Sequence, residues 1–229
     1  MPTAAIIPAA GSGLRFGEQK QFKLLEKKPL LVHSIEPFVH SSKIQETVVV
    51  VPSETVKESK RIISSYFGLE VRVVSGGKHR QMSVYNGLKT VSKDCDLVCV
   101  HDGARPFVTT RLIESTINAA RQFDGVITAV KASDTVKQSS NNTVQTTLNR
   151  DIIWLAQTPQ VFDKNKLEKA LSSLSENNNL ETDEAMTMEK MGYSIGIVEG
   201  SRYNIKITTQ EDWIFAEAII NSKPLKAFQ

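Results

Sequence analysis

The chain has 229 residues, of which 40% are hydrophobic, and this is enough apolar material for one domain with a substantial core. Its 28 Lys and Arg residues nearly balance its 25 Asp and Glu residues, so the net charge of +3 gives no reason to expect nucleic acid or a membrane as a partner. The apolar runs are far shorter than the ~20 residues that cross a bilayer, and no signal peptide precedes the first strand. We therefore expect a globular protein of the cytoplasm.

The first predicted strand, "AAIIP", leads into a loop with the sequence "AAGSGLRFGEQKQF". Glycines allow backbone N–H groups to approach an anion closely, and Arg15 and Lys20 add fixed positive charge. The spacing differs from the dinucleotide-binding fingerprint, because Phe16 stands where the third glycine belongs, and from the P-loop, because Glu18 follows Gly17. The loop favours a highly charged ligand such as a nucleoside triphosphate, although a glycine-rich turn can also merely redirect the chain.

Short apolar runs alternate with helix-length amphipathic segments along most of the chain. The predicted strands lie in "AAIIP", "TVVVVP", "EVRVVSG", "DLVCVHD", "GVITAVK" and "SIGIVEG". The predicted helices between them are Leu30–Val39, Thr55–Tyr66, Ser83–Val91 and Arg111–Phe123. Continuous valine runs are typical of strands that are buried on both faces. The pattern predicts an α/β fold with a mainly parallel sheet flanked by helices.

Three polar clusters each follow a predicted strand. The glycine loop follows "AAIIP", the segment "GGKHRQMSVYNGL" follows "VRVVS", and "HDGARP" follows "LVCV". Ligands of parallel sheets bind beyond the carboxyl ends of the strands, so we expect the three clusters to meet at one edge of the sheet.

The alternation breaks between residues 133 and 162. Threonine-rich segments flank the turn-like "SSNN", and this pattern predicts a β-hairpin at Thr135–Leu148, within an arm at about 133–150. A lone hairpin with polar faces cannot bury itself and needs a partner surface. The alternative is an irregular surface loop.

Three more helices are predicted after the hairpin. Two of them span Lys164–Leu174 and Thr182–Met191, the second of which should end at Gly192. The last begins at "TQED", a capping-box pattern that extends from Thr209 to Asp212.

Two pairs of side chains are predicted in the core. Cys95 and Cys99 lie in the strand-like "DCDLVCV", where their Cα atoms would be too far apart for a disulfide, so both should be buried thiols. Trp154 and Trp213 have apolar spacing around them and are expected to pack in the core rather than to stack on a base.

Seven motifs occur in a fixed order from Pro8 to about Thr209: "PAAGSGLRF", "KQF", "GGKHRQMSVYNGL", "VHDGARP", "TPQVF", "TDEA" and "NIKIT". In this set the chain closely resembles the methylerythritol phosphate cytidylyltransferases of bacterial and plastid isoprenoid synthesis. The resemblance implies a single cytidylyltransferase domain over 1–229 with a Rossmann-like nucleotidyltransferase fold. It also implies a protruding hairpin arm that clasps the neighbouring subunit of a homodimer.

The resemblance further implies transfer of CMP from CTP to 2-C-methyl-D-erythritol 4-phosphate, with release of pyrophosphate and with Mg²⁺ present. The attacking group would be a phosphate monoester, whose second pKa near ~6 leaves it largely dianionic at neutral pH, so no base is needed to form the nucleophile. This agrees with the absence of a Ser/His/Asp or Cys/His arrangement from the sequence. Positioning and charge neutralisation would then carry catalysis.

Two other functions stay open at this point. Ribitol 5-phosphate cytidylyltransferases are similar but tend to carry a "GGTGTR"-like loop and to lack the "DEA" ending, so "AAGSG" and "TDEA" favour isoprenoid synthesis. A non-catalytic nucleotide-binding protein could share the fold, but Arg15, Lys20, Asp102 and Lys206 are all retained.

The resemblance assigns roles to individual residues. The expected catalytic residues are Arg15, Lys20, Arg150 and Lys206. The expected CTP-binding residues are Ala9, Ala10, Gly11, Gly13, Gly77, Lys78, Ser83, Asp102 and Gly103. The expected acceptor-binding residues are Arg105, Thr135, Thr158 and Thr182. Asp102 is also the expected Mg²⁺ ligand, either directly or through water.

Some of these positions have a plainer interpretation. Asp102 could form an Asx turn or cap a helix, Arg150 and Lys206 could be solvated surface charges, and Thr135 could be an ordinary strand residue. Lys78 departs from the family pattern, because many relatives have an acidic residue there. Recognition of the base is unaffected only if the contact is made by backbone atoms.

Overall fold

The structure is a computed structural model that describes residues 1–11, 16–17, 19–174 and 183–222. A seven-stranded sheet in the order β11-β7-β10-β6-β1-β4-β5 forms the centre of this part of the chain. Its strands are β1 (Thr3–Pro8), β4 (Ile44–Val51), β5 (Val71–Ser75), β6 (Leu97–Val100), β7 (Gly125–Lys131), β10 (Trp154–Asp163) and β11 (Ile195–Glu199). A short hairpin, β2 (Leu24–Leu25) and β3 (Lys28–Pro29), lies outside the sheet.

Most neighbouring strands are parallel, as predicted. β1 pairs in parallel with β4 and β6, β4 with β5, and β7 with β11. β10 is the exception, since it lies antiparallel between β6 and β7. No strand was predicted here, because the segment from 133 to 162 breaks the strand–helix alternation and only a hairpin was expected in it. In the structure these polar side chains are buried but bonded to other elements, as when Gln160 Nε2 donates to Asp183 Oδ2 at 2.9 Å.

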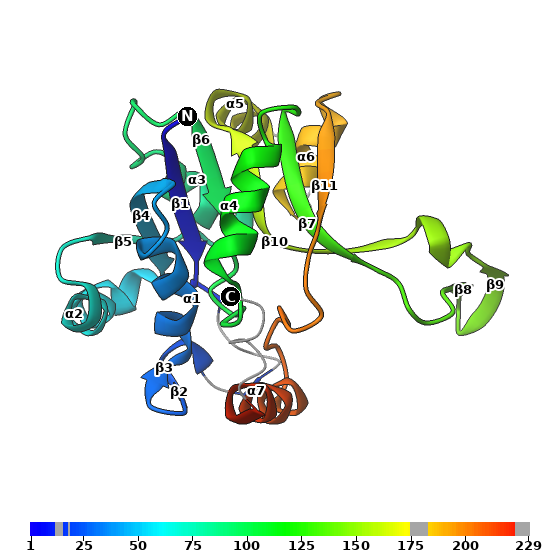
Figure 1. The fold of residues 1–229 in the computed structure, drawn as a ribbon, viewed down its shortest axis with the longest axis horizontal. Helices are drawn as coiled ribbons and strands as arrows, with labels where there is room; N and C mark the ends of the chain where they lie inside the picture. The colour runs from blue at the N-terminus through cyan, green and yellow to red at the C-terminus, as the bar shows by residue number, and fades with distance from the viewer. Residues whose placement is uncertain (12–15, 18, 175–182, 223–229) are drawn as a thin grey trace.

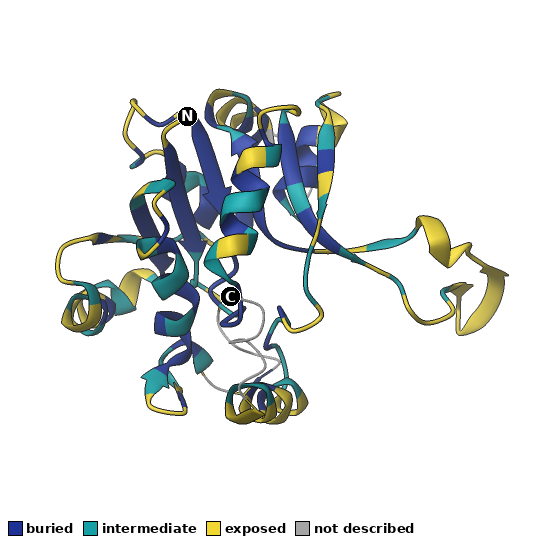
Figure 2. Ribbon diagram, viewed as in Figure 1, coloured by how far each residue is buried: buried dark blue, intermediate teal, exposed yellow. Residues whose placement is uncertain are grey.

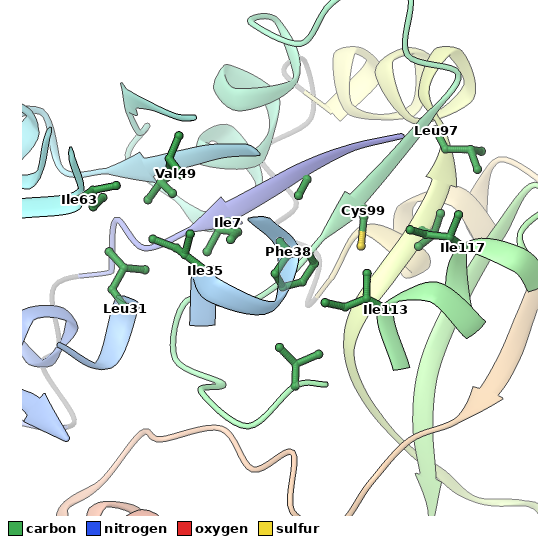
Figure 3. Packing of buried hydrophobic residues seen from close by; sticks show 14 of the residues in the cluster. Ile7, Leu31, Ile35, Phe38, Val49, Ile63, Leu97, Cys99, Ile113 and Ile117 are labelled. Atoms are coloured by element: carbon green, nitrogen blue, oxygen red, sulfur yellow. The ribbon is translucent and has the colours of Figure 1, made fainter. Parts of the chain in front are cut away.

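Helices cover both faces of the sheet (Figure 1). One face packs against α1 (Leu30–Val39), α2 (Val56–Phe67) and α4 (Thr110–Ala119), and the other against α3 (Arg80–Leu88), α5 (Lys164–Leu174) and α6 (Glu184–Lys190). The apolar run of β1 serves both layers, because Ala5 and Ile7 belong to one core cluster and Ala4 and Ile6 to the other. Figure 3 shows the first of these clusters.

A third, smaller core lies beneath α7 (Gln210–Ser222). Trp213 is buried there against Phe16, whose ring centroid is 5.7 Å away in an edge-on arrangement. The predicted capping box is present at the start of α7, because Thr209 N donates to Asp212 Oδ2 at 2.9 Å and Asp212 N donates to Thr209 Oγ1 at 3.3 Å. Among the described residues, no helix is long and apolar enough to cross a membrane.

The helix boundaries differ from the predictions at a few places. α1 and α5 have the predicted bounds, whereas α3 begins at Arg80 rather than Ser83, and α4 ends at Ala119 rather than Phe123. α6 begins at Glu184, and its N-cap is Asp183, whose side chain accepts a hydrogen bond from the backbone of Met186. The predicted first residue of that helix, Thr182, lies outside the described residues.

The predicted hairpin is present and projects from the body of the molecule (Figure 1). β8 (Lys137–Ser140) and β9 (Thr143–Thr147) pair only with each other, and the turn contains Asn141 and Asn142 with φ of 47° and 61°. Two successive left-handed residues are typical of a type I′ turn. Both strands are exposed throughout (Figure 2).

The core predictions are confirmed for three of the four side chains. Cys95 and Cys99 are buried free thiols, although Cys95 precedes β6 rather than lying in it, and Trp213 is buried. The prediction for Trp154 is wrong. It is only half-buried, because it lies at the end of β10 that continues from the arm, where Lys131 Nζ is 5.5 Å from its ring centroid.

Candidate active site

The three polar loops meet at the carboxyl edge of the sheet, as predicted. The glycines at their junctions leave little room for a side chain. A Cβ at Gly76 would lie 2.6 Å from Ala10 Cβ and 2.7 Å from Ser83 Oγ, and a Cβ at Gly103 would lie 3.1 Å from Ala9 Cβ. The loops after β1, β5 and β6 are therefore packed directly against one another.

The loop after β5 is held by its own hydrogen bonds. Gly77 N donates to Ser83 Oγ at 3.1 Å, and the buried Ser83 hydroxyl donates to His79 O at 3.1 Å. A Cβ at Gly77 would lie 2.4 Å from Met82 Cβ, so this position requires glycine. Lys78 is exposed. The roles of Gly77, Lys78 and Ser83 toward the base stay predictions.

Gly11 differs from these glycines, because a Cβ there would have no described atom within 4 Å. The fold of the described residues therefore does not require a glycine at this position. A need for close approach by a ligand would explain it. Gly13 and Arg15, which follow in the same loop, lie outside the described residues.

Lys20 begins the short 3-10 helix Lys20–Phe22, at the end of the same loop. Its Nζ is 5.4 Å from the ring centroid of Phe16, which anchors the loop on the core beneath α7. The expected partnership of Arg15 and Lys20 stays a prediction.

Asp102 follows β6 and is surrounded by cations. Its Oδ2 lies 2.8 Å from Lys206 Nζ and 3.7 Å from Arg105 Nε, and its Oδ1 accepts a hydrogen bond from Arg80 Nε at 3.0 Å. Burial alone would raise the pKa of Asp102, but Arg80, Lys206 and Arg105 outweigh it and hold that pKa well below its usual range. The carboxylate is thus a buried, ionised ion-pair partner, and Lys206 is no isolated surface charge.

Arg80 and Glu184 complete this cluster, and neither was assigned from the sequence. Both carboxylate oxygens of the fully buried Glu184 lie 2.7 Å from Arg80 Nη1. Burial raises the pKa of Glu184 while Arg80 opposes the rise, and burial would lower the pKa of Arg80 but the two carboxylates raise it. Both residues stand inside quoted motifs. The available signal was the spacing within the helix, since Ala185 and Met188, one and four residues after Glu184, face the core.

His101 and Thr158 support the backbone of Asp102. Thr158 Oγ1 accepts from Asp102 N at 3.0 Å, so its single proton is donated to His101 Nδ1, also at 3.0 Å. His101 Nε2–H then donates to Arg105 O at 3.0 Å, which assigns the tautomer. Burial lowers the pKa of His101 to about 4, so the ring is neutral.

Arg105 and Gly103 are also held by the protein itself. The buried Arg105 donates from Nη1 to Asn204 O at 2.6 Å. Gly103 N donates to Pro8 O at 3.2 Å, and Gly103 O accepts from Ser34 Oγ at 3.0 Å. Contacts of Arg105, Thr158 and Gly103 with a substrate stay predictions.

Thr135 and Arg150 lie on the arm and not with Asp102 of the same chain. Both are exposed, and Arg150 Nη1 donates to Ser133 O at 2.9 Å. The arm that carries them points away from the body (Figure 1). Thr182, the remaining predicted acceptor residue, lies outside the described residues.

The protein atoms around Asp102 could hold a metal ion only if a bound substrate supplied further ligands. The described residues contain no group of three His, Cys, Asp or Glu side chains that could hold a metal ion. Asp102 offers carboxylate oxygens, and Mg²⁺ commonly combines one or two carboxylates with substrate phosphates and water.

These features define a class: an α/β domain with a mainly parallel sheet and a cation-rich edge at the carboxyl ends of its strands. The sequence profile of the family described as 2-C-methyl-D-erythritol 4-phosphate cytidylyltransferase matches residues 3–222, and the chain belongs to this family.

Individual relatives agree with the family match. The chain is 42% identical over 221 residues to the 2-C-methyl-D-erythritol 4-phosphate cytidylyltransferase of Clostridioides difficile (strain 630), covering 95% of this chain and 93% of that one. Its structure is similar to the crystal structure of 4-diphosphocytidyl-2C-methyl-D-erythritol synthase from Anaerococcus prevotii DSM 20548, with a TM-score of 0.87, 35% identity and 96% coverage of both chains. The cytidylyltransferase of Francisella tularensis is similar with a TM-score of 0.81 and 35% identity, covering 95% and 99% of the two chains.

Proposed function

We propose that the protein transfers CMP from CTP to 2-C-methyl-D-erythritol 4-phosphate and releases pyrophosphate. The observation that carries the proposal is the Asp102 cluster beside the glycine-lined loop, in a chain that belongs to the family of that name. The cations Arg80, Arg105 and Lys206 and the carboxylates of Asp102 and Glu184 sum to one excess positive charge (three minus two), which suits polyanionic substrates.

The reaction needs little covalent chemistry from the protein. An oxygen of the acceptor phosphate attacks the α-phosphorus of CTP, the bond from that phosphorus to the bridging oxygen of the β-phosphate breaks, and pyrophosphate leaves with the electron pair. The acceptor phosphate is already an anion at neutral pH, so no side chain has to remove a proton. The protein contributes orientation and positive charge.

Specific residues would carry these contributions. Arg15 and Lys20 would bind the triphosphate and neutralise charge that develops at the α-phosphorus. Lys206 and Arg105 would face the acceptor phosphate, since both already flank the Asp102 carboxylate. The backbone at Ala9, Ala10 and Gly11, with Gly77, Ser83 and Gly103, would line the nucleotide.

We further propose that the reaction depends on Mg²⁺ held by Asp102 and the triphosphate. Asp102 would hold the ion, which would supply positive charge to offset the negative charge of the triphosphate. The support is the ionised carboxylate at the edge where the three loops meet.

We propose that two chains form a homodimer in which each arm completes the acceptor pocket of the other chain. The arm exposes its apolar side chains Val144 and Leu148, at 58% and 36%, and a hairpin of this kind needs a partner surface. Thr135 and Arg150 would then act in the partner's site, which explains why they lie apart from Asp102 of their own chain.

The activity is tested by incubating the protein with CTP, Mg²⁺ and 2-C-methyl-D-erythritol 4-phosphate. The expected result is pyrophosphate release that requires all three, together with a cytidine diphosphate product identified by its mass. CTP binding without turnover would instead support the non-catalytic protein. The cytoplasmic location stays a prediction.

The dimer is tested by mixing Arg15→Ala and Arg150→Ala chains. In a random equal mixture, half of the dimers contain one chain of each kind and each such dimer has one intact site, so about a quarter of the wild-type activity should return. A mixture that stays inactive after verified subunit exchange would contradict the exchanged-arm arrangement.

A further inference from the structure

Glu184 and Arg80 form a buried ion pair to which the proposed reaction gives no direct role. Glu184 is the first residue of α6 and is fully buried, and Arg80 is the first residue of α3. A buried carboxylate is costly unless it is paired, and here both of its oxygens lie 2.7 Å from Arg80 Nη1. Because Glu184 is fully buried, it cannot touch a substrate.

The same guanidinium reaches Asp102 with a different nitrogen. Arg80 Nε donates to Asp102 Oδ1 at 3.0 Å, while Asp102 Oδ2 lies 2.8 Å from Lys206 Nζ. A guanidinium is planar and rigid, so fixing Nη1 against Glu184 also fixes the direction in which Nε points. The orientation of the Asp102 carboxylate therefore depends on Glu184.

The start of α6, where Glu184 lies, is held in place by a hydrogen bond from the sheet to the preceding residue, Asp183. Asp183 caps α6 through Met186 N at 3.0 Å and accepts from Gln160 Nε2 of β10 at 2.9 Å. A chain of contacts thus leads from β10 through the start of α6 to Arg80, at the end of the loop that contains Gly77 and Lys78. It ends at Asp102.

We propose that Glu184 is a positioning residue for the transfer reaction: through Arg80 it sets the orientation of the Asp102 carboxylate and joins the start of helix α6 to the start of helix α3. The inference rests on the proposed function of the Asp102 site. The competing explanation is a purely structural ion pair, which would affect folding stability but not the turnover of folded protein.

The chain offers a matched control for the structural explanation. Arg72 Nη2 lies 3.4 Å from Glu46 Oε2, and the Glu46 side chain is only 19% exposed. Glu46 lies near the start of β4, at the opposite edge of the sheet from the three loops. Glu46→Gln should lower stability and leave kcat unchanged.

The decisive experiment is a double-mutant cycle on kcat with Glu184→Gln, Arg80→Gln and the double variant. Circular dichroism and thermal unfolding verify the fold, calorimetry measures the Kd for CTP, and KM is measured for both substrates. Misplacing a reacting group by about 1 Å can cost ~100-fold in rate, so Glu184→Gln should lower kcat by about 10-fold or more. We expect the Kd for CTP to stay within about threefold and the double variant to match Arg80→Gln alone, because Glu184 acts through Arg80.

Two results would overturn the inference. One is a folded Glu184→Gln protein with a kcat within about twofold of wild type, and the other is a double variant whose loss is the product of the two single losses. If Glu184→Gln does not fold, Arg80→Lys replaces it. Lysine keeps the charge but has a single nitrogen in place of the Nη1 and Nε atoms with which Arg80 contacts Glu184 and Asp102 separately. An unchanged kcat would therefore overturn the inference, and a lowered kcat would support it.

The conservative variant Glu184→Asp adds a further readout. It keeps the charge on a side chain one methylene shorter, so it should recover part of the kcat lost in Glu184→Gln. No recovery in a folded protein would count against the inference. An inactive wild-type protein would overturn the proposed function and the inference together, whereas an active wild type with unaffected variants would overturn the inference alone.

Discussion

Gly11→Ala should show whether glycine is required at this position for CTP binding or for folding stability. No described atom would lie within 4 Å of the new Cβ, and Gly11 is not in the left-handed region. Replacing such a glycine by alanine lowers the entropy of the unfolded chain, so the free energy of unfolding should stay the same or rise by up to about 1 kcal/mol. The folded protein should therefore tolerate the change.

The affinity for CTP should fall in Gly11→Ala if the backbone at Gly11 lies against the nucleotide. An extra methyl group in a close-packed contact costs about 1–3 kcal/mol, which corresponds to a roughly 5- to 150-fold higher Kd for CTP. Calorimetric titration with CTP and urea unfolding of the same preparation measure the two effects.

Gly68→Ala is the matched control with the opposite expectation. Gly68 caps α2 with φ of 60° and ψ of −126°, a conformation that side chains rarely adopt, and it lies just before β5, away from the carboxyl edge. It should lose about 1–3 kcal/mol of stability and bind CTP normally. Wild-type CTP affinity in a folded Gly11→Ala protein would refute our reasoning about the loop.

Three further predictions concern charge. Lys20→Ala should lower kcat by ~100-fold or more with little change in stability, as expected for loss of one preorganised charge-stabilising donor, and near-normal steady-state turnover would contradict this. Calorimetry should find no saturable Mg²⁺ binding without CTP, because Asp102 already pairs with three cations; micromolar binding by the free protein would contradict this. Asp124 accepts from Lys166 and from Ser194, which lowers its pKa from 3.8 to about 2. Its contribution should therefore be present above pH ~4 and be lost as the pH falls toward ~2, so urea unfolding should find Asp124→Asn about 1 kcal/mol less stable than wild type at pH 7 but not at pH 2. A difference that is independent of pH would refute that assignment.

The parallel part of the fold could be predicted from the sequence, because short valine-rich strands alternate with amphipathic, helix-length segments. The sequence was insufficient for β10, where Thr158 and Gln160 are buried polar residues whose partners come from distant elements. The pattern of polar and apolar residues along a segment contains no information about hydrogen-bond partners that are distant in the sequence. Trp154 was misplaced for the same reason, since nothing local shows that its strand continues from the arm.

The site was predictable to a similar extent. Three loops that follow strands were expected to converge. The family resemblance assigned Asp102 and Lys206 to the site with separate roles, and only the structure shows that they form an ion pair. Arg80 and Glu184 were not assigned, because their pairing joins positions 104 residues apart and depends on the burial of α6. Arg150 shows another limit, because a residue on a projecting arm can only be interpreted once the neighbouring chain is known.

A competition between two acceptors is the most direct test of the proposed acceptor, 2-C-methyl-D-erythritol 4-phosphate. Equal concentrations of 2-C-methyl-D-erythritol 4-phosphate and ribitol 5-phosphate are incubated with the protein, Mg²⁺ and limiting CTP, and the two cytidine diphosphate products are separated by mass. The product ratio equals the ratio of the two kcat/KM values. We expect the methylerythritol product to exceed the ribitol product by about tenfold or more, as is usual where a site's polar groups discriminate between acceptors. An excess of the ribitol product, or no product from either acceptor, would contradict it.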